Sequence, residues 1–126
     1  MSENKKAVLP EGTNSSGPYS PGMISGGFLF VAGQVGRGPD GKTGVTIEEQ
    51  THYVIENIRN VLQAAGCDLK DVVKATVYIT KPEYFQAYNK IYMEYFPEPR
   101  PARATVIAGL VDESFLIEIE AIAKLP

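Results

Sequence analysis

The residues best suited to chemistry are an arginine and a glutamate that lie in otherwise apolar, extended segments late in the chain. Arg103 closes the phrase Arg-Pro-Ala-Arg, and Glu118 lies in a segment that alternates isoleucine with glutamate. Charged side chains are rare in such segments unless a partner pairs with them. Because a guanidinium fork binds carboxylates and a carboxylate can orient water, the two residues predict a site for a small carboxylate substrate and a water molecule. A purely structural ion pair of Arg103 with Glu118 or Glu120 is the alternative.

Two further polar residues are candidates for the same site. Tyr19 lies in a loop rich in glycine and proline, where it either walls a pocket or serves packing. Asn89 lies among aromatic residues of an expected helix, where a backbone hydrogen bond is the alternative role. His52 is the only histidine and has no cysteine or acid at metal-ligand spacing, so a zinc site is not expected. The sequence also contains no nucleophile elbow, P-loop or dinucleotide fingerprint.

Length and charge favour one acidic domain spanning residues 1–126. The net charge of −3 argues against strong nucleic-acid binding, because contacts to phosphate need a basic surface. The single cysteine, Cys67, excludes an intrachain disulfide. No apolar run reaches the length of a membrane span and the first residues lack a signal-peptide core, so we expect a soluble, cytoplasmic protein.

Strands and helices are expected in an order that would position these candidates. A capping box at Thr46-Ile47-Glu48-Glu49 predicts a helix that ends at Gly66, and a similar cap at Thr80-Lys81-Pro82-Glu83 predicts a second helix that ends at Pro97. Strands are predicted at 28–32 (ended by Gly33), 72–80, 102–107 and 115–123, with short strands in the loop region 10–27. Each helix carries one apolar stripe, which in the second helix includes Phe85, Tyr88 and Tyr92. Both helices are therefore expected to cover one face of a sheet in an α+β fold.

Alternation along the strands assigns the candidates to faces of this sheet. The side chains expected under the helices are Val73, Ala75, Val77 and Ile79 in one strand and Ile117, Ile119, Ala121 and Ala123 in the last. In the strand between them, small residues such as Ala102 and Ala104 should lie under the helices, which leaves Arg103 and Glu118 together on the open face. Since that face mixes apolar and charged groups, we predict a homo-oligomer with a polar pocket at the subunit contact.

Phrases along nearly the whole chain resemble one protein family. They are Gly17-Pro18-Tyr19-Ser20, Phe30-Val31-Ala32-Gly33-Gln34, Asp71-Val72-Val73-Lys74-Ala75-Thr76-Val77-Tyr78, Asn89-Lys90-Ile91-Tyr92, Arg100-Pro101-Ala102-Arg103 and Ile117-Glu118-Ile119-Glu120-Ala121-Ile122-Ala123. On the basis of these sequence segments, the chain resembles the RidA/YjgF/YER057c/UK114 family from about residue 7 to 124.

The resemblance implies a fold like that of a small trimeric chorismate mutase, with three pockets between the subunits of a homotrimer. It implies 2-iminobutanoate/2-iminopropanoate deaminase activity, in which imines or enamines released by pyridoxal-phosphate enzymes are hydrolysed to 2-oxo acids and ammonia. The family uses no cofactor and no metal. Matched by position, Arg103 corresponds to the arginine that grips the substrate carboxylate and Glu118 to the acid that positions water. Tyr19 corresponds to the pocket tyrosine and Asn89 to a helix asparagine near the site.

The chain departs from the family pattern at two positions of the expected site. Ala32 stands where relatives carry a serine, and Thr105 stands where many carry a cysteine. Ala32 lacks a hydroxyl for substrate or water, and a lost hydrogen bond of that kind costs about 0.5–1.5 kcal/mol. Thr105 keeps a polar lining without a thiol. Neither change removes the arginine or the acid.

Other functions remain compatible with the sequence. Deamination of 2-aminomuconate or aminoacrylate is the same chemistry in a differently shaped pocket. The resemblance also allows an endoribonuclease-like activity, since some relatives look like endoribonucleases, although the acidic composition and the lack of a basic, aromatic groove speak against it. A module that binds a metabolite without converting it is the non-enzymatic alternative. Nucleic acid and membranes are not expected partners, whereas an imino or 2-oxo acid is.

Overall fold

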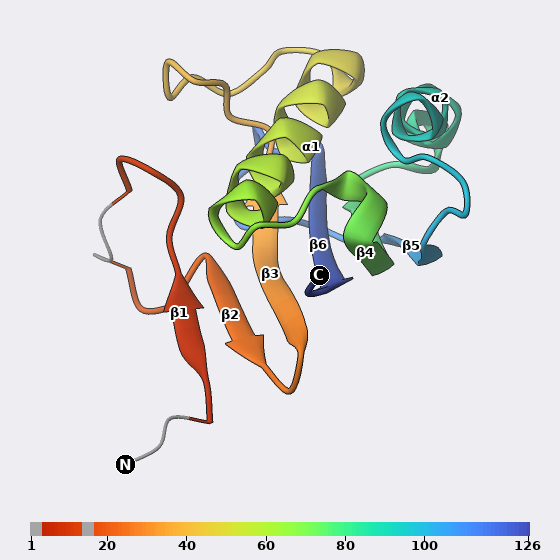
Figure 1. Cartoon of the computed structure of the whole chain (residues 1–126). Helices are drawn as coiled ribbons and strands as arrows, with labels where there is room; N and C mark the ends of the chain where they lie inside the picture. Colours follow the sequence, from red (N-terminus) through yellow and green to blue (C-terminus); the bar gives the residue numbers. More distant parts are fainter. Residues whose placement is uncertain (1–3, 14–16) are drawn as a thin grey trace.

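The computed structural model describes residues 4–13 and 17–126 and has an α+β fold, as predicted (Figure 1). The strands are β1 (Lys6–Val8), β2 (Gly22–Ser25), β3 (Phe28–Val35), β4 (Val72–Ile79), β5 (Ala102–Ile107) and β6 (Ile117–Lys124). The helices are α1 (Ile47–Ala64) and α2 (Phe85–Tyr95), with two short 3-10 helices, η1 (Leu69–Asp71) and η2 (Pro82–Tyr84). The strands form one sheet in the order β1-β2-β3-β6-β4-β5, and among the described strands only β4 and β5 pair in parallel.

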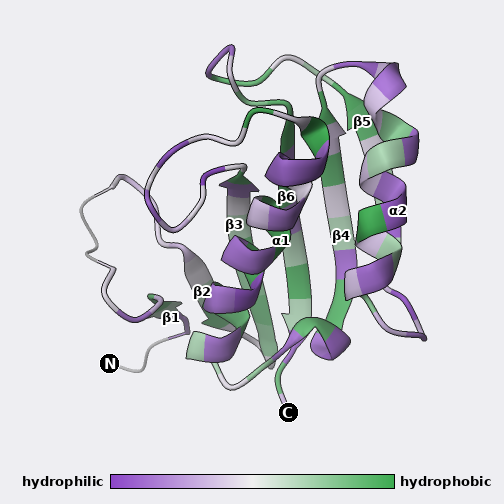
Figure 2. Cartoon of the chain, turned by 90° about the horizontal axis from the view of Figure 1, so that it is seen from above, coloured by the Kyte–Doolittle hydropathy of each residue, from purple (hydrophilic) through white to green (hydrophobic). Residues whose placement is uncertain are grey.

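Both helices lie on the same face of this sheet. Figure 2 shows α1 over β3 and β6, and α2 beside it towards the β4–β5 edge. The start of α1 follows the expected signal, since the Thr46 hydroxyl accepts a hydrogen bond from the Glu49 N–H at 3.1 Å. At the other end, Ala65 is the C-cap and Gly66 follows with a φ of 80°, a backbone conformation that favours glycine. Local signals in the sequence therefore account for both ends of this helix.

The second helix begins differently from the prediction. Lys81 precedes η2 without a side-chain cap, and α2 starts only at Phe85. Pro82 opens η2, where its missing N–H and fixed φ are tolerated, and this short turn leads into α2. The helix buries Tyr88, Ile91 and Tyr92, whereas Phe85 is partly exposed.

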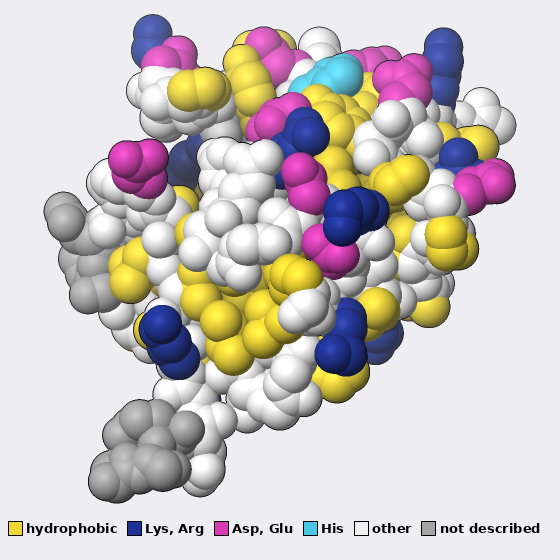
Figure 3. All heavy atoms as spheres, viewed as in Figure 1, with side chains coloured by type: hydrophobic (Ala, Val, Ile, Leu, Met, Phe, Trp, Pro, Cys, Tyr) yellow, Lys and Arg dark blue, Asp and Glu magenta, His cyan; other side chains and the backbone are white. Residues whose placement is uncertain are grey.

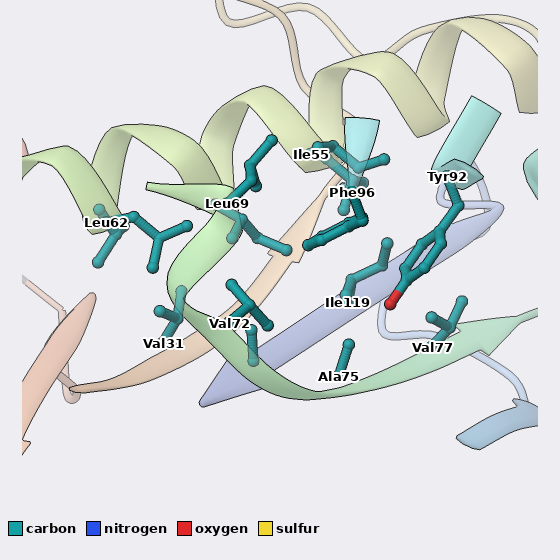
Figure 4. Packing of buried hydrophobic residues seen from close by; sticks show 14 of the residues in the cluster. Val31, Ile55, Leu62, Leu69, Val72, Ala75, Val77, Tyr92, Phe96 and Ile119 are labelled. Atoms are coloured by element: carbon teal, nitrogen blue, oxygen red, sulfur yellow. The ribbon is translucent and has the colours of Figure 1, made fainter. Parts of the chain in front are cut away.

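The core lies between the helices and the sheet. Figure 4 shows Ile55 and Leu62 of α1, Tyr92 of α2 and Phe96 just after α2 above Val31, Ala75, Val77 and Ile119 of the sheet. Ile117, Ile119, Ala121 and Ala123 of β6 are buried under the helices, as alternation predicted. Each large side chain buried here contributes about 1.5–3 kcal/mol of hydrophobic stabilisation.

Two bulges change the expected strand pattern. Val73 is 44% exposed and Val72 is buried in its place, because the pairing of β4 with β6 shifts between Val72 and Lys74. The prediction for Val73 was therefore wrong, whereas those for Ala75, Val77 and Ile79 are confirmed. In β3, pairing with β6 shifts between Val31 and Gln34, so the strand bends at Ala32 and Gly33 and continues to Val35 instead of ending at Gly33.

The opposite face of the sheet has no helix over it among the described residues. It presents apolar side chains that include Phe30 and Val106, which are 44% and 41% exposed, next to the acids Glu118 and Glu120 of β6. This mixture matches the open face expected from the sequence. No helix in the described part of the chain combines the length and the apolar character that a membrane crossing requires.

Candidate active site

Glu118 points from β6 to the open face, at the bulge of β3. Glu118 is paired with Val35 of β3 on one side and with Tyr78 of β4 on the other. Its carboxyl group packs against Gly33, where an added Cβ atom would overlap it. A glycine is therefore required at the bulge for the carboxyl group to occupy this position.

The surroundings of Glu118 favour the protonated form of its carboxyl group more than bulk water would. Burial raises the pKa of this carboxyl above its ordinary value, and the neighbouring charge of Glu120 raises it further. No hydrogen bond to the Glu118 carboxyl comes from any residue that the structure describes. A partly buried, unpaired carboxyl with a raised pKa is suited to accepting a proton from water and passing it on.

A hollow of about 490 Å³ opens in front of Glu118. Its lining includes Tyr19, Ala32, Gly33, Arg37, Phe115 and Glu118. Tyr19 is 65% exposed and stands at the edge of the hollow. Tyr19, Ala32 and Glu118, three of the residues predicted from the sequence, are thus brought together.

Arg103 lies in a second hollow, of about 430 Å³, between β5 and α2. Its guanidinium donates a hydrogen bond to the Asn89 side-chain oxygen at 2.7 Å and lies 4.8 Å from the ring centroid of Tyr92 and 5.4 Å from that of Tyr88. Aromatic faces attract cations, so these contacts fix the guanidinium in one orientation. No carboxylate of the described residues pairs with Arg103, which leaves its remaining donors free.

Thr105 belongs to the same part of the chain as Arg103. Its hydroxyl forms a short hydrogen bond with the hydroxyl of Tyr88 in α2. Asn89, Arg103 and Thr105, the other predicted residues, therefore also lie close together. The hydroxyl of Thr105 is already used inside the protein, in contrast to the free polar lining that the sequence suggested.

The prediction that Arg103 and Glu118 share one face of the sheet was wrong. In the parallel pair of β4 and β5, Arg103 is paired with Ala75, whose side chain is buried under the helices. Arg103 consequently points to the helix side, whereas Glu118 points to the open face. The arginine is tolerated there because β5 is an edge strand and the rings and the asparagine of α2 surround the cation. Within one chain, the predicted site is therefore split into two halves.

Sequence reasoning missed Arg37 and Phe115 in the hollow of Glu118, and the aromatic rings around Arg103. Arg37 lies in a glycine-rich loop without periodicity, so nothing local indicated where its side chain points. The rings had a weak signal, because Tyr88 and Tyr92 are four residues apart on one helix face.

Other cavities and side chains offer less chemistry. Another hollow, of about 620 Å³, lies between α1 and the loop before β2. Its lining includes the amides Asn57, Asn60 and Gln63 and one acid, Glu11. His52 pairs with the Tyr95 hydroxyl at 3.0 Å. Among residues 4–13 and 17–126, no three histidines, cysteines or acids gather as metal ligands would.

Tyr92 supplies a stability prediction that does not depend on function. Its hydroxyl is buried without a hydrogen-bond partner, and burial raises its pKa to about 12. Because an unsatisfied buried hydroxyl costs about 1–3 kcal/mol, Tyr92→Phe is expected to stabilise the protein by about 1 kcal/mol in chemical denaturation. The matched control is Tyr88→Phe, which removes the partner of Thr105 and should lower stability. Equal losses in both variants would contradict this interpretation.

Comparison with known proteins shows similarity along almost the whole chain. A family model described as endoribonuclease L-PSP matches residues 11–125. A RutC family protein of Pyrococcus horikoshii is 47% identical over 111 residues, which cover 85% of this chain and 86% of the relative. The structure of RidA from an Antarctic Psychrobacter superposes with a TM-score of 0.87 at 30% identity, covering 95% of this chain and 99% of that one. E. coli TdcF with bound serine superposes with a TM-score of 0.86 at 29% identity, covering 96% and 99%.

Proposed function

The chain belongs to the endoribonuclease L-PSP family, also known as the RidA/YjgF/YER057c/UK114 family, and from this premise we propose that it is a 2-iminobutanoate/2-iminopropanoate deaminase. The observation that carries the proposal is the pair of half-sites. One holds an unpaired, oriented guanidinium and the other an unpaired carboxyl of raised pKa. An imino acid carries a carboxylate, which the guanidinium can bind, and an electrophilic carbon, which a water molecule held by the carboxyl group can attack.

We further propose that each active site forms between two copies of the chain in a homotrimer. Arg103 lies at the β5 edge and Glu118 on the open face, so one chain cannot direct both groups at one small molecule. A neighbouring copy whose β5 edge approaches the open face would join the two halves. The exposed apolar side chains on that face, Phe30 and Val106 among them, favour such a contact over exposure to water.

In the proposed reaction, Arg103 binds the substrate carboxylate through its fork and Asn89 holds the guanidinium in place. The Glu118 carboxylate accepts a proton from water as the water oxygen bonds to the imine carbon and the π electrons move to nitrogen. Glu118 passes this proton to the nitrogen, which gives a carbinolamine. Glu118 then relays the hydroxyl proton of the carbinolamine to the amine nitrogen, the carbon–nitrogen bond breaks with ammonia as the leaving group, and an oxygen lone pair forms the carbonyl. The products are the 2-oxo acid and ammonia, and Glu118 returns to its starting state. No step requires a cofactor or a covalent intermediate with the enzyme.

Several observations support a small amino-acid-like substrate. TdcF, a relative of the same fold, binds serine, which also carries a carboxylate next to a carbon bonded to nitrogen. Charges of both signs are interspersed over the face shown in Figure 3, and the net charge is −3, so a continuous basic surface for RNA is absent from that face. The cytoplasm, where pyridoxal-phosphate dehydratases generate such imines, is the proposed compartment.

The test is a coupled assay. Threonine dehydratase generates 2-iminobutanoate from threonine in the presence of semicarbazide, which traps the imine. We expect the wild-type protein to reduce semicarbazone formation in proportion to its concentration. Unchanged semicarbazone formation would contradict deaminase activity, and RNA cleavage by the same preparation would then support the endoribonuclease alternative.

Glu120 supplies a prediction about pH. The ionised carboxylate of Glu118 is the active form, so the rate falls as the pH drops through its pKa. Burial and then the charge of Glu120 raise this pKa. Glu120→Gln removes that charge and is therefore expected to shift the acidic limb of the kcat/KM profile to lower pH. An unchanged or upward-shifted limb would show that Glu118 does not control it.

A further inference from the structure

Arg37 places a guanidinium in the hollow of Glu118, and the proposed reaction leaves it without a role. Its guanidinium carbon lies 5.2 Å from the centroid of the Phe115 ring, and both side chains line the hollow. No described carboxylate lies within salt-bridge distance of Arg37. The pKa of Asp112 is lowered mainly by hydrogen bonds from Ser114 and slightly by Arg37, so this acid is near but already engaged.

The backbone of Arg37 is tied to α1 and to the other side of its own loop. The Asn57 side-chain amide of α1 donates hydrogen bonds to the carbonyls of Val35 and Arg37 at 3.1 and 2.9 Å. Arg37 also pairs with Thr43 across its loop. Since Phe115 is buried, the ring that carries the guanidinium is itself fixed. The contact with Phe115 therefore favours an orientation in which the exposed guanidinium lines the hollow before a ligand binds.

We infer that Arg37 selects imino acids whose side chain ends in a carboxylate, an inference that rests on the proposed function. With the α-carboxylate on Arg103 and the imine carbon beside Glu118, the side chain of the substrate extends into the hollow that Arg37 lines. A terminal carboxylate there meets repulsion from Glu118, and the guanidinium of Arg37 offsets it. The fork of an arginine matches two carboxylate oxygens, and the small side chain of Ala32 leaves space beside it.

The experiment compares two imines of equal length that differ in charge. Amino-acid oxidases convert L-glutamate and L-glutamine to their imines in the presence of semicarbazide, and 2-iminobutanoate serves as the reference substrate. We expect wild-type kcat/KM to be at least tenfold higher for the glutamate imine than for the glutamine imine, the factor associated with about 1.4 kcal/mol. Arg37→Met should reduce that ratio to near one, mainly through KM. Lys42→Met removes a charge from the same loop outside the hollow and should leave the ratio unchanged.

The outcomes distinguish failure of the role inferred for Arg37 from failure of the proposed deaminase function. Hydrolysis of 2-iminobutanoate with an acid-to-amide ratio near one in the wild type would overturn the role of Arg37 alone. A high ratio that Arg37→Met does not change would overturn it as well. Failure of the wild type to hydrolyse any of the three imines would overturn the deaminase function and, with it, this inference. Circular dichroism and thermal unfolding of Arg37→Met establish that the variant is folded.

Discussion

Glu118→Gln is expected to lower kcat by about 100- to 10,000-fold, the range that general acid–base catalysis contributes. The amide keeps the shape of the side chain against Gly33 but cannot accept a proton from water. The measurement is the initial rate of imine hydrolysis by the purified variant in the semicarbazide assay. Glu120→Gln is the matched control, because it removes a neighbouring acid of the same strand and should retain most of the rate at the optimal pH.

Glu118→Gln is also expected to leave the free energy of unfolding unchanged, or to increase it, at neutral pH. Burial raises the pKa of Glu118 in the folded protein, so folding favours its protonated form. The stability associated with this group is thus complete below the unfolded-state pKa and declines as the pH rises through the folded-state pKa. Because glutamine does not ionise, Glu118→Gln avoids this loss of stability at neutral pH. A marked fall in the melting temperature together with the fall in rate would instead identify Glu118 as a structural residue.

Arg103→Met is expected to lower kcat/KM for 2-iminobutanoate by about 100-fold, because a charge-assisted bidentate contact and the orientation that it provides are both lost. Methionine keeps an apolar stem against the rings of Tyr88 and Tyr92, so the fold should survive. Arg103→Lys should recover only part of the loss, since an ammonium group lacks the fork.

Arg100 provides the control for Arg103. It lines the same hollow, but its guanidinium is engaged by the Glu98 carboxylate at 3.1 Å and the Phe96 carbonyl at 3.1 Å. Arg100→Met should therefore change kcat/KM much less than Arg103→Met. Equal losses would mean that general positive charge, and not the oriented guanidinium, binds the substrate.

The parts of the fold that could be predicted are those with local signals. Thr46 and Gly66 mark the ends of α1 through capping and a positive φ, which depend on neighbouring residues only. The strict alternation of isoleucine or alanine with other residues assigned Glu118 to the open face correctly, because one side of β6 is fully buried. The two strand bulges had no such signal, since the shift at Val73 arises from pairing with a distant strand.

The face occupied by Arg103 could not be read from β5 itself. Both sets of alternating side chains in this edge strand are largely exposed, so hydrophobic contrast does not specify a direction. The direction is set by the parallel register with β4 and by the rings of α2, both of which are tertiary features. The family resemblance implied pockets between subunits, whereas the assignment of Arg103 and Glu118 to opposite faces of one chain follows only from the tertiary structure.

The most direct test of the shared site is complementation between two inactive variants. Arg103→Met and Glu118→Gln chains, each with a different affinity tag, are co-expressed, and oligomers that carry both tags are purified in two steps. In a closed trimer whose sites combine Arg103 of one copy with Glu118 of the next, every mixed trimer contains one intact site of three. We therefore predict about one third of wild-type imine hydrolysis, from parents that are each nearly inactive. Mixed oligomers no more active than their parents would contradict a site formed between copies.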